Sequence, residues 1–143
     1  MLRGISPLLT PDLLHALASM GHGDDIVIAD ANFPAAANAR RLIPLAGVDA
    51  PTALAAILSL LPLDDFEPHP ARVMQVVGDA AAIPDPVRDF AEILARHGAS
   101  PHGLERHEFY REAARAFAVV HTGERRFYGN IILRKGVIPP DAG

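Results

Sequence analysis

The sequence predicts an α/β fold with a mixed sheet, in which an antiparallel pair of strands lies at the C-terminal end. Short apolar runs rich in β-branched residues alternate along the chain with segments of helical periodicity. In the run DDIVIAD, residues 24–30, charged residues enclose the apolar ones, as in a buried parallel strand. A chain of 143 residues has the usual size of one domain, and we expect a single domain over residues 1–143.

A helix and then a strand are expected in the first thirty residues. Thr10 is a suitable N-cap, Pro11 suits the first helical position, and Gly21 suits a left-handed stop. The strand at 24–30 follows. It places Asp30 at its C-terminal end, which is where ligands usually bind in open α/β sheets.

The middle of the chain continues the alternation of strands and helices. A connection rich in Pro and Ala, residues 32–41, leads to a short second strand at 41–45. Asp49 is a candidate cap for the helix that follows, and Pro62 ends this helix. The next strand is expected at 72–77.

The last third is expected to hold two helices and two strands. Asp85 is a candidate cap for the first helix, and the residues at 99–103 have the composition of a turn. The second helix covers 105–116. The strands at 117–122 and 130–136 enclose a turn, and we expect them to pair as a hairpin.

Composition excludes several classes of protein. The absence of Cys removes disulfides, thiolate catalysis, Cys-bound zinc and iron–sulfur clusters, and it suits a reducing cytoplasm. The net charge of −4, with scattered basic residues, argues against nucleic acid as a partner. The first residues lack the apolar core of a signal peptide, and no uncharged run is long enough to span a bilayer. We therefore expect a cytoplasmic protein without a membrane segment.

His22 is the main candidate for proton transfer among the seven His residues. It lies between two Gly on the loop that joins the first predicted helix and strand, so its imidazole is accessible. An imidazole with an ordinary pKa of about 6.5 is the usual proton carrier near neutral pH. On the residues alone, an ordinary surface His is an equally good explanation. The chain has no HExxH motif, so we expect no metal site.

Other polar residues could bind a hydroxyl-rich ligand, although each has a simpler explanation. Asp30 could face the cleft of His22 or cap the next turn. In the turn FYGN, a phenol and a carboxamide flank a flexible Gly, which could recognise hydroxyls or only form the turn. The block RHEFYREAARAF carries an Arg and a Tyr where a solvated helix face is the ordinary role. The candidates from these two segments are Arg106, Tyr110, Tyr128, Gly129 and Asn130.

Four motifs, taken together and in order, resemble a known family. They are GHGD (21–24), DANFP (30–34), RxxFY (106–110) and TGExxxYGN (122–130). With them the chain resembles the L-fucose mutarotase branch of the family that is shared with D-ribose pyranase. The likeness spans nearly the whole chain, and its middle third carries little of it.

This resemblance implies a three-layer αβα fold of the ribose-pyranase-like type. It also implies an isomerase that interconverts the α and β anomers of L-fucose or a related monosaccharide, with no cofactor and no metal. The expected assembly is a homo-oligomer, a decamer of two pentameric rings, with each active site between neighbouring subunits. By the same resemblance His22 would be the proton donor. The residues holding the sugar would be Asp30, Arg106, Tyr128, Gly129 and Asn130, with Tyr110 as a further candidate.

Two other functions remain open. One is a D-ribose pyranase, which interconverts pyranose and furanose forms. Four positions favour the fucose branch over it: Phe33, Arg106, Tyr110 and Gly129. Asn32, where some fucose mutarotases have His, leaves the identity of the sugar open. The other function is a non-catalytic monosaccharide-binding accessory protein, which would use the same pocket and would not need His22.

Overall fold

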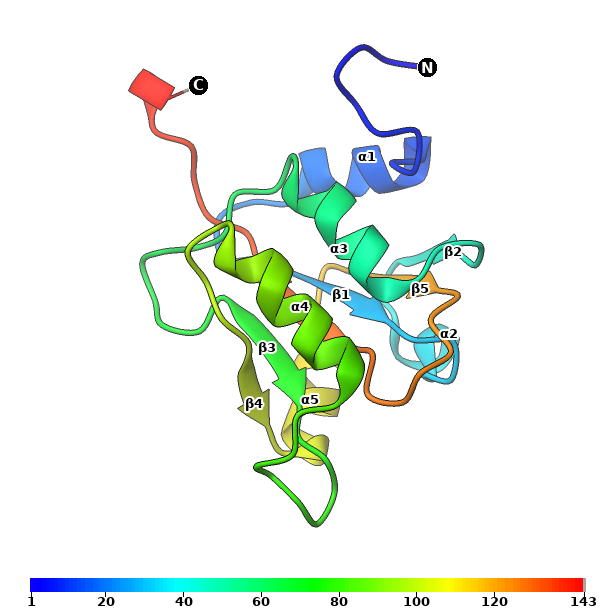
Figure 1. Cartoon of the computed structure of the whole chain (residues 1–143). Helices are drawn as coiled ribbons and strands as arrows, with labels where there is room; N and C mark the ends of the chain where they lie inside the picture. Colours follow the sequence, from blue (N-terminus) through cyan, green and yellow to red (C-terminus); the bar gives the residue numbers. More distant parts are fainter. Residues whose placement is uncertain (143) are drawn as a thin grey trace.

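A six-stranded mixed sheet with helices on both faces organises the chain (Figure 1). The computed structural model describes residues 1–142. The strands, in the spatial order β2-β5-β1-β6-β3-β4, are β1 (Asp25–Ala29), β2 (Leu42–Leu45), β3 (Ala71–Met74), β4 (His102–Leu104), β5 (Ala118–Thr122) and β6 (Ile131–Arg134). The helices are α1 (Pro11–Ser19), α2 (Ala35–Asn38), α3 (Ala50–Leu58), α4 (Asp85–Ala95) and α5 (Arg106–Arg115), followed by a 3₁₀ turn at Pro140–Ala142.

The helices form two layers around the sheet. Helices α1, α3 and α4 cover one face, and α2 and α5 cover the other (Figure 1). Strand β1 shows why both faces are covered, because successive side chains point to opposite sides. Its Ile26 and Ile28 pack under the first layer, whereas Val27 and Ala29 pack under the second. The expected α/β class, mixed sheet and three layers are confirmed.

The pairing of the last two strands differs from the prediction. Strand β5 lies parallel to β1 and β2, whereas β6 is antiparallel to β1 and β3. The predicted hairpin is therefore wrong, because β1 lies between the two strands. Residues Ile131 to Leu133 of β6 are fully buried, and a central position hides both faces of such an apolar strand.

The first helix begins as predicted and ends differently. The Thr10 hydroxyl accepts a hydrogen bond from the backbone N–H of Leu13, at 3.3 Å. The helix stops at Ser19, and its C-cap is Met20 in an extended conformation. Gly21 is thus not the left-handed stop. That conformation occurs at Gly23, with φ +88°, beside the backbone that carries His22.

Other local differences follow from short or Pro-rich stretches. Asp85 is the first residue of α4 rather than its cap, and its carboxylate pairs with Arg88 at 3.0 Å. The predicted turn at 99–103 contains most of β4, a three-residue edge strand too short to give a pattern. The Pro- and Ala-rich connection holds the four-residue α2, and α3 ends before Pro62. None of the helices in residues 1–142 combines the length and hydropathy that crossing a bilayer requires.

Candidate functional site

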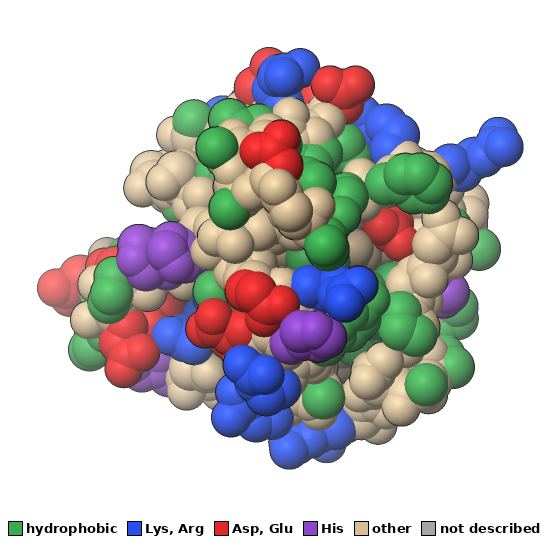
Figure 2. Space-filling model, turned by 90° about the horizontal axis from the view of Figure 1, so that it is seen from below, with side chains coloured by type: hydrophobic (Ala, Val, Ile, Leu, Met, Phe, Trp, Pro, Cys, Tyr) green, Lys and Arg blue, Asp and Glu red, His purple; other side chains and the backbone are tan. Residues whose placement is uncertain are grey.

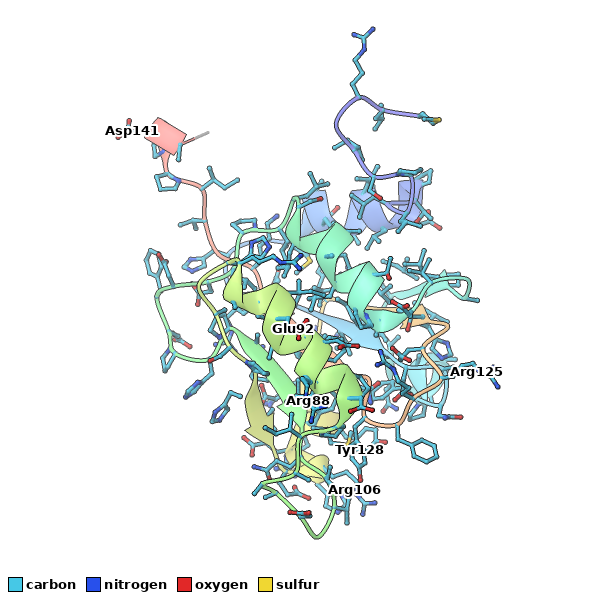
Figure 3. All side chains as sticks on the ribbon, viewed as in Figure 1. Arg88, Glu92, Arg106, Arg125, Tyr128 and Asp141 are labelled. Carbon is cyan, nitrogen blue, oxygen red and sulfur yellow. The ribbon has the colours of Figure 1, made fainter. Side chains whose placement is uncertain are left out.

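A pocket of about 350 Å³ opens beside the C-terminal end of β1, and we call it the Asp30 pocket. Arg106 and Tyr128 lie near each other at the lower edge of the molecule (Figure 3). Seen from that side, acidic, basic and His side chains are interspersed rather than gathered by sign (Figure 2). The lining residues are Asp30, Asn32, Phe33, Met74, Val77, Arg106, Tyr110, Phe127, Tyr128 and Asn130.

Asp30 is the buried centre of this pocket. Its Oδ1 accepts a hydrogen bond from the N–H of Asn32 at 3.0 Å. Its Oδ2 accepts from the Gly129 N–H and from Asn130 Nδ2, both at 3.2 Å. Burial raises the pKa of Asp30 above its ordinary value even though these donors act in the opposite direction. The carboxyl therefore ties the turn 128–130 to the end of β1 and takes up a proton more readily than an exposed Asp.

The turn that carries Tyr128 and Asn130 has a constrained backbone. Tyr128 has φ +62°, a conformation that is uncommon outside Gly, and its hydroxyl accepts a hydrogen bond from the Val77 N–H at 3.1 Å. At Gly129, an added Cβ would lie 2.6 Å from Cγ of Glu124. Only a residue without a side chain fits there, so the turn can approach Asp30 closely.

Glu124 packs against Gly129 of this turn. This residue was not singled out as a site residue from the sequence. It is buried, and its carboxylate accepts hydrogen bonds from Nε, a terminal guanidinium nitrogen and the backbone N–H of Arg126, at 2.8 to 3.1 Å. The guanidinium also binds Asp89 of α4 at 2.8 Å. These bonds from Arg126 hold the pKa of Glu124 below its ordinary value. Arg126 thus links the buried Glu124 to α4 through an exposed ion pair with Asp89.

An aromatic wall faces the polar side of the Asp30 pocket. The rings of Phe33 and Tyr110 are stacked, with centroids 5.5 Å apart and an angle of 20°. Tyr110 and Arg106 are both on α5, one turn apart, which explains why they reach the same pocket. Hydroxyl-binding groups opposite an aromatic surface suit a ligand with hydroxyls on one side and C–H groups on another.

His22 lies elsewhere, before the N-terminal end of β1. Its Nε2 is 3.0 Å from Oδ1 of Asp64. Burial opposes the charge of this carboxylate, but the hydrogen bonds from His22 and from the Phe66 N–H outweigh it and lower the pKa of Asp64. The two residues belong to a second pocket of about 430 Å³, the His22 pocket, whose lining is His22, Gly23, Asp64, Phe66, Glu67 and Arg134.

The two pockets are well separated within one chain. The four residue steps of β1 alone span about 13 Å. The structure therefore gathers Asp30, Arg106, Tyr110, Tyr128, Gly129 and Asn130, and it leaves His22 apart from them. Sequence reasoning missed Asp64, which lies in the polar loop DDFEPHPA. The acidic residues of that loop are visible in the sequence, but its partner is 42 positions away.

A further pocket of about 490 Å³ lies between the loop after β3 and the start of α5, and it shares Arg106 with the Asp30 pocket. A larger cavity of about 530 Å³, between α1 and the residues after α3, has a mainly apolar lining and contains none of the predicted site residues. Within residues 1–142, no three His, Asp or Glu side chains are grouped closely enough to hold a metal ion.

The model of the RbsD / FucU transport protein family matches residues 3–138. The chain belongs to this family. Human fucose mutarotase, one of its curated relatives, is 47% identical over 145 residues, which cover 96% of this chain and 94% of the relative. The resemblance that the four motifs carry is confirmed for the family as a whole.

Solved structures agree with this membership of the RbsD / FucU family. The fucose mutarotase of Streptococcus pneumoniae, solved in complex with L-fucose, is 41% identical, with a TM-score of 0.90 over 96% of this chain and all of that one. Bacillus subtilis RbsD, solved in complex with D-ribose, is 24% identical, with a TM-score of 0.75 over 97% of this chain and all of that one. The second likeness concerns the fold alone.

Proposed function

We propose that this protein is a cofactor-free isomerase that interconverts the α and β anomers of L-fucose or a closely related monosaccharide. The observation that carries the proposal is the Asp30 pocket, in which a buried carboxyl, a carboxamide, a phenol and a guanidinium face an aromatic wall. The sequence identity of 41 to 47% to fucose mutarotases, over nearly the full length of the chain, supports the same reaction and the same sugar.

Anomer exchange requires two proton transfers and one rotation. A proton leaves the anomeric hydroxyl while another is delivered to the ring oxygen, and the bond between the anomeric carbon and the ring oxygen breaks. Rotation about the adjacent C–C bond presents the other face of the aldehyde, and the reverse transfers close the ring. Atoms and charge balance without an oxidant or reductant. Each positioned acid or base contributes about 10² to 10⁴ in rate.

The residues of the Asp30 pocket suit the binding part of this reaction. Asp30 and Asn130 offer acceptors and donors to sugar hydroxyls, and the planar fork of Arg106 can donate to two hydroxyls. The hydroxyl of Tyr128 is already oriented by the Val77 N–H. In this proposal Gly129 lets the backbone approach the sugar, and Tyr110 contributes the aromatic wall.

His22 is the proposed proton donor, and Asp64 positions it. While Nε2 donates to the Asp64 carboxylate, Nδ1 of the protonated ring can deliver its proton to the ring oxygen of the sugar, and the neutral ring that results can accept the proton that leaves the anomeric hydroxyl. The Asp64 carboxylate also holds the imidazole of His22 in one orientation during these transfers. His22 is partly exposed, as a group that must meet a ligand has to be.

Because His22 and the Asp30 pocket lie at opposite ends of β1, we propose that His22 of one copy completes the Asp30 pocket of a neighbouring copy. The separation of about 13 Å or more within one chain is too large for direct proton transfer. Phe127, exposed at the edge of the Asp30 pocket, is an apolar side chain that such a neighbour would cover. A decamer of two pentameric rings is the assembly we expect.

Magnetisation exchange between the anomeric protons of L-fucose, D-ribose and D-galactose, with and without protein, tests the proposed reaction. We expect faster exchange for L-fucose. Faster pyranose–furanose exchange of ribose with no effect on fucose would indicate a ribose pyranase instead. Binding of sugars with no faster exchange for any of them would indicate a non-catalytic accessory protein. The cytoplasm remains our expected location.

A further inference from the structure

An aromatic ring stands exposed beside the proposed proton donor. Phe66 is 70% exposed and lines the His22 pocket. Aromatic side chains are common in the linings of small-molecule sites, and a ring at the mouth of a polar pocket is in a position to contact the ligand. In the proposed reaction Phe66 has no role so far, although it is the only Phe, Tyr or Trp in the lining of the described His22 pocket.

Phe66 is held as one unit with the proposed proton-transfer pair. Its ring meets the imidazole of His22 edge to face, with centroids 4.7 Å apart and an angle of 67°. Its backbone N–H donates to Oδ1 of Asp64 at 3.2 Å, and this is the oxygen that His22 Nε2 also contacts. A substrate placed at the accessible side of His22 therefore lies beside the Phe66 ring.

We propose that Phe66 reaches the bound sugar together with His22 and packs its ring against a C–H face of the substrate. This inference rests on the proposed function, in which the two pockets of neighbouring copies form one site. The face of an aromatic ring carries partial negative charge, and it attracts the weakly positive hydrogens of C–H groups. A sugar whose hydroxyls bind Asp30 and Asn130 presents its C–H groups away from that polar floor.

The contact would give the substrate two aromatic surfaces from two chains. Phe33 and Tyr110 supply one from the Asp30 pocket, and Phe66 supplies the other. Enclosing the sugar between them excludes water while the open-chain aldehyde exists, and it aligns the ring oxygen with His22. Phe66 therefore contributes to binding and positioning, whereas the proton itself moves through His22.

The basic test replaces the ring in every chain. Phe66→Ala should raise the KM for L-fucose about threefold to tenfold, the effect expected for losing one aromatic contact. Phe66→Tyr keeps the ring face and should restore most of the binding. Ile83→Ala is the matched control, because Ile83 is 61% exposed and lines neither pocket, so its KM should equal that of the wild type.

A mixed assembly shows which half of the site Phe66 serves. Chains with His22→Ala are co-expressed with chains carrying Arg106→Glu, and two affinity tags select assemblies that contain both. Arg106 is exposed, so reversing the charge of its side chain impairs the pocket without disturbing the core. Activity should return where His22 of the Arg106→Glu chain meets the intact pocket of the other chain. Phe66→Ala on the Arg106→Glu chain should lower the recovered kcat/KM, whereas on the His22→Ala chain it should not.

Three results would overturn this role of Phe66. The first is recovered activity that does not depend on which chain carries Phe66→Ala. The second is an unchanged KM in the uniform variant. The third is dissociation of the assembly by Phe66→Ala in size-exclusion chromatography, which would make the ring a subunit contact. If the mixture recovers no activity although the wild type is active, the shared site fails and this inference fails with it. If the wild type exchanges no anomers, the proposed function itself fails.

Discussion

His22 and Asp30 lie at opposite ends of the same buried strand, β1, and belong to different pockets. An extended strand cannot bring its two flanking loops together, so no side-chain rearrangement within one chain joins the two residues. The two residues are only eight positions apart in the sequence, which suggests that they are close in space. Because most of the residues between them form an extended strand, they are instead far apart. In the proposed reaction, which uses both residues, His22 and Asp30 therefore come from two different copies of the chain.

His22→Ala should remove most of the anomer exchange and leave the fold intact. Its side chain is 40% exposed, so little packing is lost, whereas loss of the positioned acid should reduce the rate about 10² to 10⁴ fold. Exchange spectroscopy on L-fucose gives the rate, and thermal unfolding checks the fold. An exchange rate equal to that of the wild type would remove His22 from the mechanism.

Asp64→Asn should lower kcat and should destabilise the fold in a pH-dependent way. The pKa of Asp64 is lowered in the folded protein, so its carboxylate stabilises the fold above the unfolded pKa of about 3.9. This contribution disappears as the pH falls through the lower, folded pKa. The difference in unfolding free energy between wild type and variant should therefore be present at neutral pH and shrink below about pH 4. Urea unfolding at both pH values measures it, and a constant difference would contradict the assignment.

Arg106→Ala should mainly weaken sugar binding. A guanidinium that donates to two hydroxyls supplies charge-assisted hydrogen bonds, and its loss should raise the KM about tenfold with a smaller change in kcat. Arg106→Lys should restore little, because an ammonium lacks the planar fork. Exchange rates measured over a range of sugar concentrations separate the two constants. An unaltered KM in the Ala variant would count against this anchoring role.

Gly129→Ala should destabilise the protein by about 1 to 3 kcal/mol, because overpacking forces its neighbours to move. The new Cβ would meet Glu124, which Arg126 holds in place and which cannot move freely. Gly47→Ala is the matched control, since its Cβ would meet nothing within 4 Å. Urea unfolding compares the two variants. Equal stabilities would show that the turn has more room than the structure indicates.

Local signals predict much of this fold. The cap at Thr10, the buried strand before Asp30 and the helix after Glu105 depend on neighbouring residues, and each forms close to where it is expected. The position of β6 between β1 and β3 depends instead on contacts about 60 to 110 residues apart, which periodicity does not report. Even the apolar runs that identify a strand do not tell which strand it pairs with.

The candidate site, like the fold, was predictable only in part from the sequence. The types of residue in the FYGN turn and at the start of α5 indicate a hydroxyl-binding edge, and the structure places them around one pocket with Asp30. Their roles in sugar chemistry came from the resemblance to a family rather than from spacing. The partnership of His22 with Asp64 was not predicted, because it forms only when α1, β1 and the loop after α3 have packed.

The central place of β6 also bears on how the chain is made. Strand β6 is the last of the six strands to be synthesised, yet both β1 and β3 need it as a hydrogen-bonding partner. Until then the sheet exists at most as two separate pieces, β2-β5-β1 and β3-β4, each with an unpaired apolar edge. A nascent chain that stalls shortly before Ile131 would therefore expose two unpaired strand edges, and the addition of β6 is the step that covers both of them.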